Sequence, residues 1–129
     1  MRGRYLLDTN VVIALLNGEL AVQRALAEAP EAFLSIFTLG ELFYGAYKSV
    51  RIDQNLARIE DLATATAVLE VDPETARHYG MIKTRLLKRG KPIPENDIWN
   101  AALARQYGLT LVSRDGHFLE VDDLWREAW

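Results

Sequence analysis

Short apolar segments alternate with amphipathic helical segments along most of this chain, and this order is what most constrains the fold. The segments with strand character span three to five residues, and the segments between them repeat apolar residues at intervals of three and four. Strands that alternate with helices predict an α/β fold with a mostly parallel sheet. We therefore expect three layers, α/β/α, around a central sheet of four to five strands.

The sequence sets approximate boundaries for these elements. The predicted strands are residues 5–7, 33–37, 67–71, 109–112 and 119–121, and the predicted helices are residues 11–16, 22–29, 38–50, 53–63, 72–89 and 96–107. Thr38 is the predicted N-cap of the third helix, and Asp72 followed by Pro73 predicts the start of the fifth. Connections are short and the chain has 129 residues, so we expect one domain over residues 1–129.

Composition excludes several classes of protein. The chain has no cysteine and only two histidines, which excludes disulfide frameworks, thiolate zinc sites, cysteine nucleophiles and three-histidine metal sites. Any metal would have to be held by oxygen ligands. The longest apolar run, residues 11–16, is far shorter than the roughly 20 residues of a membrane-spanning helix. No signal-peptide pattern is present at the amino terminus, so we expect a cytoplasmic protein without a membrane partner.

The net charge is −3, but the charges are unevenly distributed. Residues 77–91 contain six basic residues and no acidic one, which leaves nine basic against 18 acidic residues elsewhere. A basic segment on an acidic body could guide a phosphate backbone, although a solvated helix face would have the same composition. The residues considered for such contact are Lys83, Arg85, Lys88, Arg89 and Lys91.

Four acidic residues lie just after predicted strands or at the starts of predicted helices. They are Asp8, Glu41, Asp97 and Asp115, separated by 33, 56 and 18 positions. Ligands of parallel α/β sheets bind beyond the carboxyl ends of the strands. The predicted fold can therefore bring all four carboxylates to one edge of the sheet.

Each acid also has a purely structural explanation. Asp8 and Asp97 could satisfy free amides at the starts of their helices. Glu41 could complete a capping box with Thr38, and Asp115 precedes a glycine in a common turn dipeptide. Capping does not require four carboxylates on one side of a sheet, so a shared site is the favoured interpretation.

A cluster of carboxylates is self-repelling, and a divalent cation relieves the repulsion. Oxygen ligands suit Mg²⁺ or Mn²⁺, whereas Ca²⁺ prefers a cage with more protein oxygens. A magnesium ion held by few carboxylates completes its coordination with water and substrate phosphate oxygens. An acidic pocket of this kind can therefore act on a polyanion.

Four strings in the sequence carry a resemblance to a known family. The strings are residues 7–11 (LDTNV), 40–45 (GELFYG), 95–102 (ENDIWNAA) and 112–118 (VSRDGHF). They resemble the four signature blocks of PIN-domain nucleases and, more narrowly, of the VapC toxins of bacterial and archaeal toxin–antitoxin pairs. The blocks occur in the family's order and extend over most of the chain.

This resemblance implies a PIN-like fold and a Mg²⁺- or Mn²⁺-dependent endoribonuclease. It implies that Asp8, Glu41, Asp97 and Asp115 form the catalytic, metal-binding site. Asp8 and Asp97 are the best candidates for direct ligands, and the other two would complete the coordination directly or through water. Catalysis with one ion and catalysis with two both remain open.

Other residues near these acids are expected to play supporting roles. Asn10 and Ser113 would orient ligands or water. Ser113 departs from the threonine usual in the family, and Asn100 stands where an apolar residue is more usual, so Asn100 would either adjust packing or add a polar contact near the site. His117 could approach a phosphate, but we expect it to pack beside Phe118.

The resemblance also implies partners. These are an RNA substrate and a cognate antitoxin whose tail blocks the acidic pocket. A homodimer is expected as well, because the first three predicted helices carry much apolar surface.

Three alternatives remain at the level of sequence. A PIN nuclease of RNA processing would work without an antitoxin. A Mg²⁺-binding receiver module of signalling would need a lysine after a late strand, where this chain has Ser113, Arg114 and Asp115. In the third alternative, a binding module, the carboxylates would be helix caps only.

Overall fold

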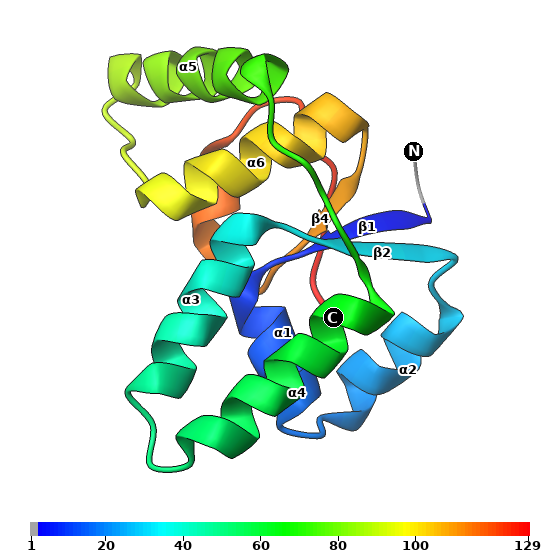
Figure 1. The fold of residues 1–129 in the computed structure, drawn as a ribbon. Coiled ribbons are helices and arrows are strands. Elements are labelled where there is room, and N and C mark those ends of the chain that lie inside the picture. Colours follow the sequence, from blue (N-terminus) through cyan, green and yellow to red (C-terminus); the bar gives the residue numbers. More distant parts are fainter. Residues whose placement is uncertain (1–2) are drawn as a thin grey trace.

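The computed structural model describes residues 3–129 and contains one five-stranded sheet (Figure 1). The strand order is β3-β2-β1-β4-β5, and every neighbouring pair is parallel. The strands are β1 (Arg4–Leu7), β2 (Glu31–Leu34), β3 (Ala67–Val68), β4 (Thr110–Val112) and β5 (Arg126–Glu127). The predicted parallel α/β architecture is confirmed.

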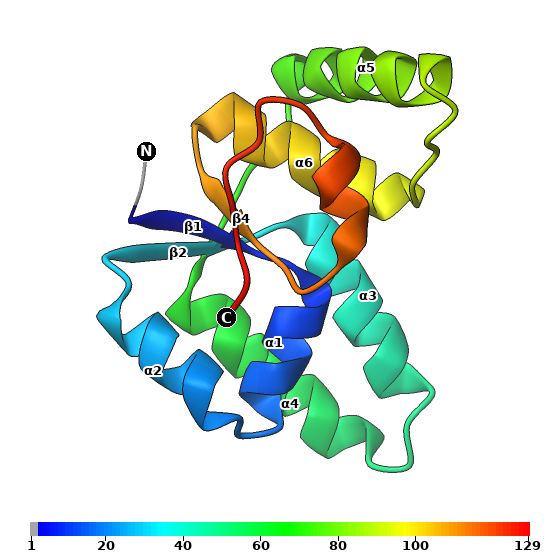
Figure 2. The ribbon, with the colours of Figure 1, turned by 180° about the vertical axis from the view of Figure 1, so that it is seen from behind.

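Six α-helices and one 3₁₀ helix surround the sheet. They are α1 (Thr9–Leu16), α2 (Leu20–Glu28), α3 (Ile36–Tyr47), α4 (Ile52–Ala65), α5 (Pro73–Lys88), α6 (Glu95–Tyr107) and η1 (Gly116–Glu120). Helices α1 to α4 lie on one side of the strands and α5 and α6 on the other, as both views show (Figures 1 and 2). Among residues 3–129, no helix combines the length and the apolar character needed to cross a bilayer.

Each face of the sheet has its own hydrophobic core. Leu6 points into the core beneath α5 and α6, whereas Leu7 points into the core beneath α1, α3 and α4. Successive residues of a strand face opposite sides, so β1 alternates between the two cores. The chain changes face between β3 and α5, after residue 68 and before residue 73.

Two helix boundaries follow the local sequence closely. Asp72 accepts a hydrogen bond from the Thr75 amide and Thr75 Oγ1 accepts one from the Asp72 amide, so α5 begins with a capping box and Pro73 in its first turn. Helix α6 ends at Gly108, whose φ of +66° is readily adopted only by glycine. The start of α5 was predicted from Asp72 and Pro73, and the end of α6 agrees with the predicted bound at residue 107.

A strand forms where residues 33–37 predict one, but its predicted bounds and the predicted N-cap at Thr38 are wrong. Strand β2 ends at Leu34, and α3 begins at Ile36 with Ser35 as its N-cap. Ser35 Oγ accepts the Thr38 amide at 3.0 Å. Ile36 and Phe37 are apolar and are compatible with a strand or a helix. The Ser35 hydroxyl favours the helix, because it caps the helix start.

The carboxyl-terminal part also differs from prediction. Residues 119–121 form no strand, because η1 extends through Glu120. The fifth strand is instead β5, a two-residue edge strand that pairs with β4 and has two exposed charged residues. Strand β3 covers only the first two residues of the predicted 67–71, and α6 starts one residue before predicted.

Candidate active site

Asp8 is the buried centre of the candidate site. It follows β1 directly, and its side chain is only 4% exposed. Ser113 Oγ donates to Asp8 Oδ2 at 2.8 Å, and Asn100 Nδ2 donates to Asp8 Oδ1 at 3.2 Å. Both carboxylate oxygens are thus held in place by hydrogen bonds from residues more than 90 positions away.

Burial raises the pKa of Asp8 above its usual value, because the charged form loses hydration. The hydrogen bonds from Ser113 and Asn100 oppose this effect, and the charge of Glu41 adds to it. The charged form of Asp8 is therefore disfavoured in the folded protein despite these hydrogen bonds.

Asp97, Asp115 and His117 form a group of side chains near the Asp8 carboxylate. One ligand atom from each of these three side chains lies within 4.8 Å of the others. His117 Nδ1 is 2.8 Å from Asp97 Oδ2 and 3.0 Å from Asp115 Oδ1. Asp97 stands in the first turn of α6, and Asp115 precedes η1.

The pKa of Asp97 is raised to about 6. Burial is the largest cause, and repulsion from Asp8 and Asp115 contributes, against the lowering effect of the His117 hydrogen bond. The repulsion shows that Asp8 and Asp97 belong to one electrostatic cluster, although Asp8 lies outside the three-residue group.

Glu41 lies at the margin of the cluster. It is partly exposed on α3, and Asn96 Nδ2 donates to its Oε1 at 3.0 Å. Asn96 directly precedes Asp97, so this bond links α3 to the start of α6. Glu41 is near enough to raise the pKa of Asp8.

The capping explanation fails for Asp8 and Glu41, whereas Asp97 lies in the first turn of α6 without a side-chain capping bond. Asp8 occupies the N-cap position of α1 but makes no side-chain capping bond, and Pro94 is the N-cap of α6. Glu41 is engaged by Asn96, and Thr38 does not begin a helix. Only Asp115 acts as a cap, accepting the His117 amide at 2.9 Å.

Ser113 and Asn10 form a polar frame around Asp8. Asn10 Nδ2 donates to Ser113 Oγ at 3.3 Å and approaches Asp8 Oδ2 at 3.5 Å. Ser113 Oγ also accepts the Asp115 amide at 3.0 Å. The serine hydroxyl therefore connects Asp8 with the turn that carries Asp115.

Two polar side chains whose roles the sequence left open contact the acids. His117 does not pack beside Phe118: the His117 side chain is 46% exposed and contacts two acids, whereas Phe118 is buried in the core. Asn100 contacts Asp8 directly and is fully buried. The signal for His117 was its position two residues after Asp115, and for Asn100 its departure from an apolar position.

The basic segment ends beside the acidic cluster. Lys83 is bound to Glu95, next to the start of α6, and Arg89 is bound to Asp122. Arg85 and Lys88 are exposed in the last turn of α5. The connector leads from this end of α5 to the amino-terminal end of α6, on the same side of the molecule (Figure 1).

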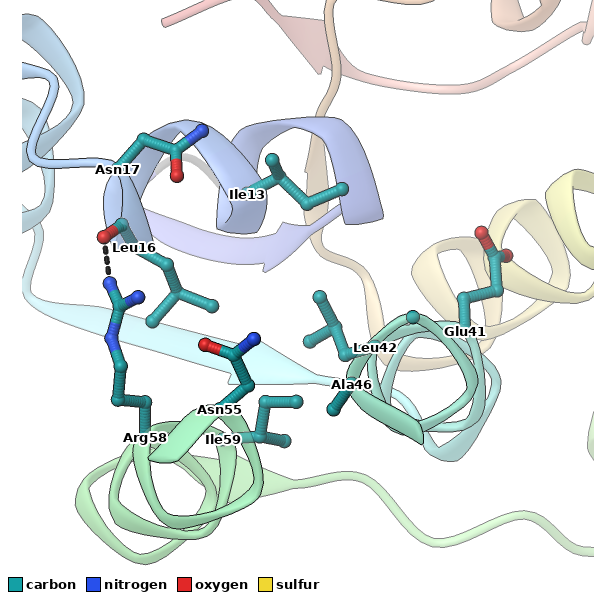
Figure 3. A pocket seen from close by; sticks show the side chains of 10 residues that line it. Ile13, Leu16, Asn17, Glu41, Leu42, Ala46, Asn55, Arg58 and Ile59 are labelled. Atoms are coloured by element: carbon teal, nitrogen blue, oxygen red, sulfur yellow. Dashed lines mark hydrogen bonds between the residues drawn. The ribbon is translucent and has the colours of Figure 1, made fainter. Parts of the chain in front are cut away.

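An apolar groove flanks the site on the other side. It has a volume of about 270 Å³ and lies between α1, α3 and α4 (Figure 3). Ile13, Leu42 and Ile59 contribute apolar side chains, and Glu41 stands at the end of the groove opposite Arg58. The groove thus leads along α3 to the acidic cluster.

The donor set fits a divalent cation. Asp97 and Asp115 offer carboxylate oxygens that lie within 4.8 Å of one another, close enough to share one cation. His117 adds an imidazole nitrogen that the sequence analysis did not anticipate.

Comparison with known families and proteins defines the class of this site. A family model described as "PIN domain" matches residues 5–124. The chain is 41% identical to Ribonuclease VapC2 of Haemophilus influenzae and 34% identical to the tRNA(fMet)-specific endonuclease VapC of Shigella flexneri, with 98% of each chain covered. A DNA-bound VapBC structure from Salmonella typhimurium superimposes with a TM-score of 0.90 at 31% identity, again over 98% of each chain.

The chain therefore belongs to the PIN-domain family of nucleases, which depend on divalent metal ions. Within that family it is a VapC-type endoribonuclease, the toxin component of a toxin–antitoxin pair.

Proposed function

We propose that this protein hydrolyses phosphodiester bonds of RNA at a Mg²⁺ or Mn²⁺ site formed by Asp8, Glu41, Asp97 and Asp115. The observation that carries the proposal is geometric: ligand atoms of Asp97, Asp115 and His117 lie within 4.8 Å of one another, and the buried Asp8 is near enough to interact with Asp97. The charges of Asp8 and Asp115 raise the pKa of Asp97, and the charge of Glu41 raises that of Asp8. Asp8 and Asp97 are the proposed direct ligands, and the other two complete the coordination.

A divalent cation bound there would lower the pKa of a coordinated water and stabilise negative charge on the scissile phosphate. The protein's own contribution is to hold the acids in place. Ser113 and Asn10 orient Asp8. The backbone amide of Asp115 donates a hydrogen bond to Ser113 Oγ, and this bond fixes the turn after β4. No side chain has to form a covalent bond with the substrate.

Cleavage of a labelled RNA in Mg²⁺, Mn²⁺ or EDTA tests this proposal. We expect wild-type protein to cut in either metal and not in EDTA, and Asp8→Asn and Asp97→Asn to lose at least about 100-fold in rate, a magnitude typical of removing a group that stabilises transition-state charge. Asp61→Asn is the matched control, because Asp61 is an exposed acid on α4 and does not belong to the acidic cluster. Equal cutting by wild type and both site variants would overturn the site.

RNA is proposed to approach over the basic end of α5. Arg85 and Lys88 are available for phosphate contact, whereas Lys83 and Arg89 already bind acidic partners. Lys91 is exposed in the connector that leads to Asp97. A phosphate backbone on this surface would pass directly from the basic segment to the metal site.

The protein partner is proposed to be a cognate antitoxin that occupies the apolar groove. Two similar structures are VapBC complexes, from Salmonella typhimurium and Rickettsia felis. The groove has an apolar lining and ends at Glu41, so an apolar antitoxin segment that ends in a basic residue would fill both groove and acidic cluster. Bound there, the segment would block the RNA site.

Ile13→Asp tests the groove, because this side chain lines it and is 47% exposed. We expect at least about a tenfold loss of affinity for the antitoxin encoded beside the gene, with RNA cleavage retained. Leu87→Asp is the control, since Leu87 is 56% exposed on α5, away from the groove. Undiminished binding by Ile13→Asp would exclude the groove, and the absence of an adjacent antitoxin would favour an RNA-processing role.

The free protein is proposed to form a homodimer. Exposed apolar side chains on α1, α2 and α3 support this proposal, and they include Ile13, Leu20, Ile36, Tyr44 and Tyr47. Light scattering after size exclusion measures the mass directly. A monomeric mass of 14.6 kDa at micromolar concentration would contradict it.

A further inference from the structure

The buried amide of Asn100 joins the three parts of the chain that carry the innermost acids. Asn100 lies inside α6, one turn after Asp97, and its side chain has no exposed surface. Asn100 Nδ2 donates to Asp8 Oδ1 and to Thr38 Oγ1, each at 3.2 Å. Asn100 Oδ1 accepts from Ser35 Oγ at 2.5 Å.

Every partner of this amide belongs to an element that bears an acid. Asp8 follows β1, Ser35 is the N-cap of α3, and Thr38 lies in the first turn of α3, which carries Glu41. Thr38 Oγ1 also accepts from Thr9 Oγ1 at 3.4 Å, in the first turn of α1. The network therefore connects α6, α3 and the start of α1 through side chains alone.

A buried amide in the middle of a helix is costly unless its polar atoms are satisfied. Here the carbonyl oxygen has one partner and the amino group has two, so the site is built around an amide rather than around an apolar residue. The amide also sets the rotation of the Asp8 carboxylate, because it holds Oδ1 while Ser113 holds Oδ2.

From this geometry we infer that Asn100 is a positioning residue for metal binding. It fixes Asp8 and locks the acid-bearing helices α3 and α6 to one another. Replacing a residue that orients a metal ligand commonly weakens metal affinity 10–100-fold. The inference rests on the proposed metal site, and Asn100 acts through Asp8 without contact with the substrate.

The test is the affinity of the purified full chain for Mn²⁺, measured by electron paramagnetic resonance without RNA. Asn100→Leu replaces the amide by an apolar side chain of related shape, and we expect the Kd for Mn²⁺ to rise at least tenfold. Thr38→Val removes one acceptor of the amide and leaves the bond to Asp8 intact, so we expect a rise of a few fold. The metal concentration that half-saturates RNA cleavage should move in parallel.

Two controls separate positioning from general damage. Leu86→Ala creates a cavity in the core beneath α5 and α6 and lowers stability without touching the network. Thr110→Val replaces a buried hydroxyl that has no hydrogen-bond partner among the described residues. Both should keep the wild-type Kd for Mn²⁺, even if Leu86→Ala lowers the Tm as much as Asn100→Leu.

The outcomes are distinct. A Kd for Asn100→Leu within twofold of wild type, or an equal loss in Leu86→Ala, would overturn the role of Asn100. Failure of wild type to bind Mn²⁺, or unchanged binding by Asp8→Asn, would overturn the metal site itself and the inference with it.

Discussion

Folding buries two carboxylates at this site, and burial disfavours their charged forms. The pKa values of Asp8 and Asp97 are both raised, and burial is the main cause in each case. A side chain whose charged form is disfavoured in the folded state makes the protein less stable when it ionises. The site therefore costs the metal-free protein some stability at neutral pH, and cation binding would restore it.

This cost gives a pH-dependent prediction for Asp97→Asn in EDTA. The pKa of Asp97 is raised from 3.8 to about 6, so its contribution to stability is fully present below about pH 4 and is lost as the pH rises through 6. The variant should therefore unfold a few degrees above wild type at pH 7.5 and at the same temperature at pH 4. Thermal unfolding followed by circular dichroism measures the difference, and a lower Tm at pH 7.5 would contradict the pKa shift.

Ser113 supplies a second prediction at the scale of one residue. Ser113→Ala removes the donor to Asp8 Oδ2 and the acceptor of the Asp115 amide, so we expect Mn²⁺ affinity and cleavage to fall by about 10–100-fold. Ser113→Thr keeps the hydroxyl and should retain both. Equal losses in the two variants would mean that packing around the side chain, rather than its oxygen, is what matters.

At the scale of elements, the residues that cap the start of α5 should contribute to stability without affecting activity. The capping box of α5 is reinforced by Gln106, whose Nε2 donates to Asp72 Oδ1 at 2.8 Å. Asp72→Ala removes this cap and its link to α6, so the free energy of unfolding should fall by about 1–2 kcal/mol. RNA cleavage at a temperature where both proteins are folded should be unchanged, because Asp72 is remote from the four acids.

Urea unfolding gives the stability and a cleavage assay gives the activity. A large loss of activity at unchanged folded fraction would show that α5 positions the site more directly than its contacts indicate.

The sequence predicts elements well where one residue decides the boundary. Pro73 and Gly108 act through their own backbone, so the start of α5 and the end of α6 could be predicted locally. Ile36 and Phe37 carry no such signal, which explains the misplaced start of α3. Strand β5 could not be predicted from its two charged residues, because only pairing with β4 makes it a strand.

The acids of the site were predictable from the order of strands and helices, because parallel strands bring their carboxyl ends together. Asn10 and Ser113 beside them were also predicted, but the contacts of Asn100 and His117 with the acids were not. Asn100 reaches Asp8 across 92 positions, and His117 reaches Asp97 across 20. Such contacts depend on how the layers pack, and no local pattern encodes that packing.

At the scale of the whole molecule, the basic end of α5 leads to a salt-dependence prediction. Replacing Arg85 and Lys88 together by alanine should raise the KM for RNA several fold and leave kcat unchanged. The slope of the logarithm of the binding constant against the logarithm of the salt concentration should fall by an amount that corresponds to about one to two phosphate contacts. The matched control is Arg24→Ala with Arg51→Ala, two exposed arginines on the opposite face of the sheet. Titrations at several salt concentrations distinguish them, and equal effects would rule out a local RNA path.

Between β3 and α5 the chain passes from one face of the sheet to the other, and this crossing separates the four acids into two pairs as it separates the two cores. Asp8 and Glu41 precede the crossing, and Asp97 and Asp115 follow it. A gene cut within residues 69–72 would yield two fragments, each with half of the acids and neither with a complete site. Co-expressed, the fragments would have to pair β1 with β4 and pack α3 against α6 to rebuild the site, so toxicity would report on their reassembly.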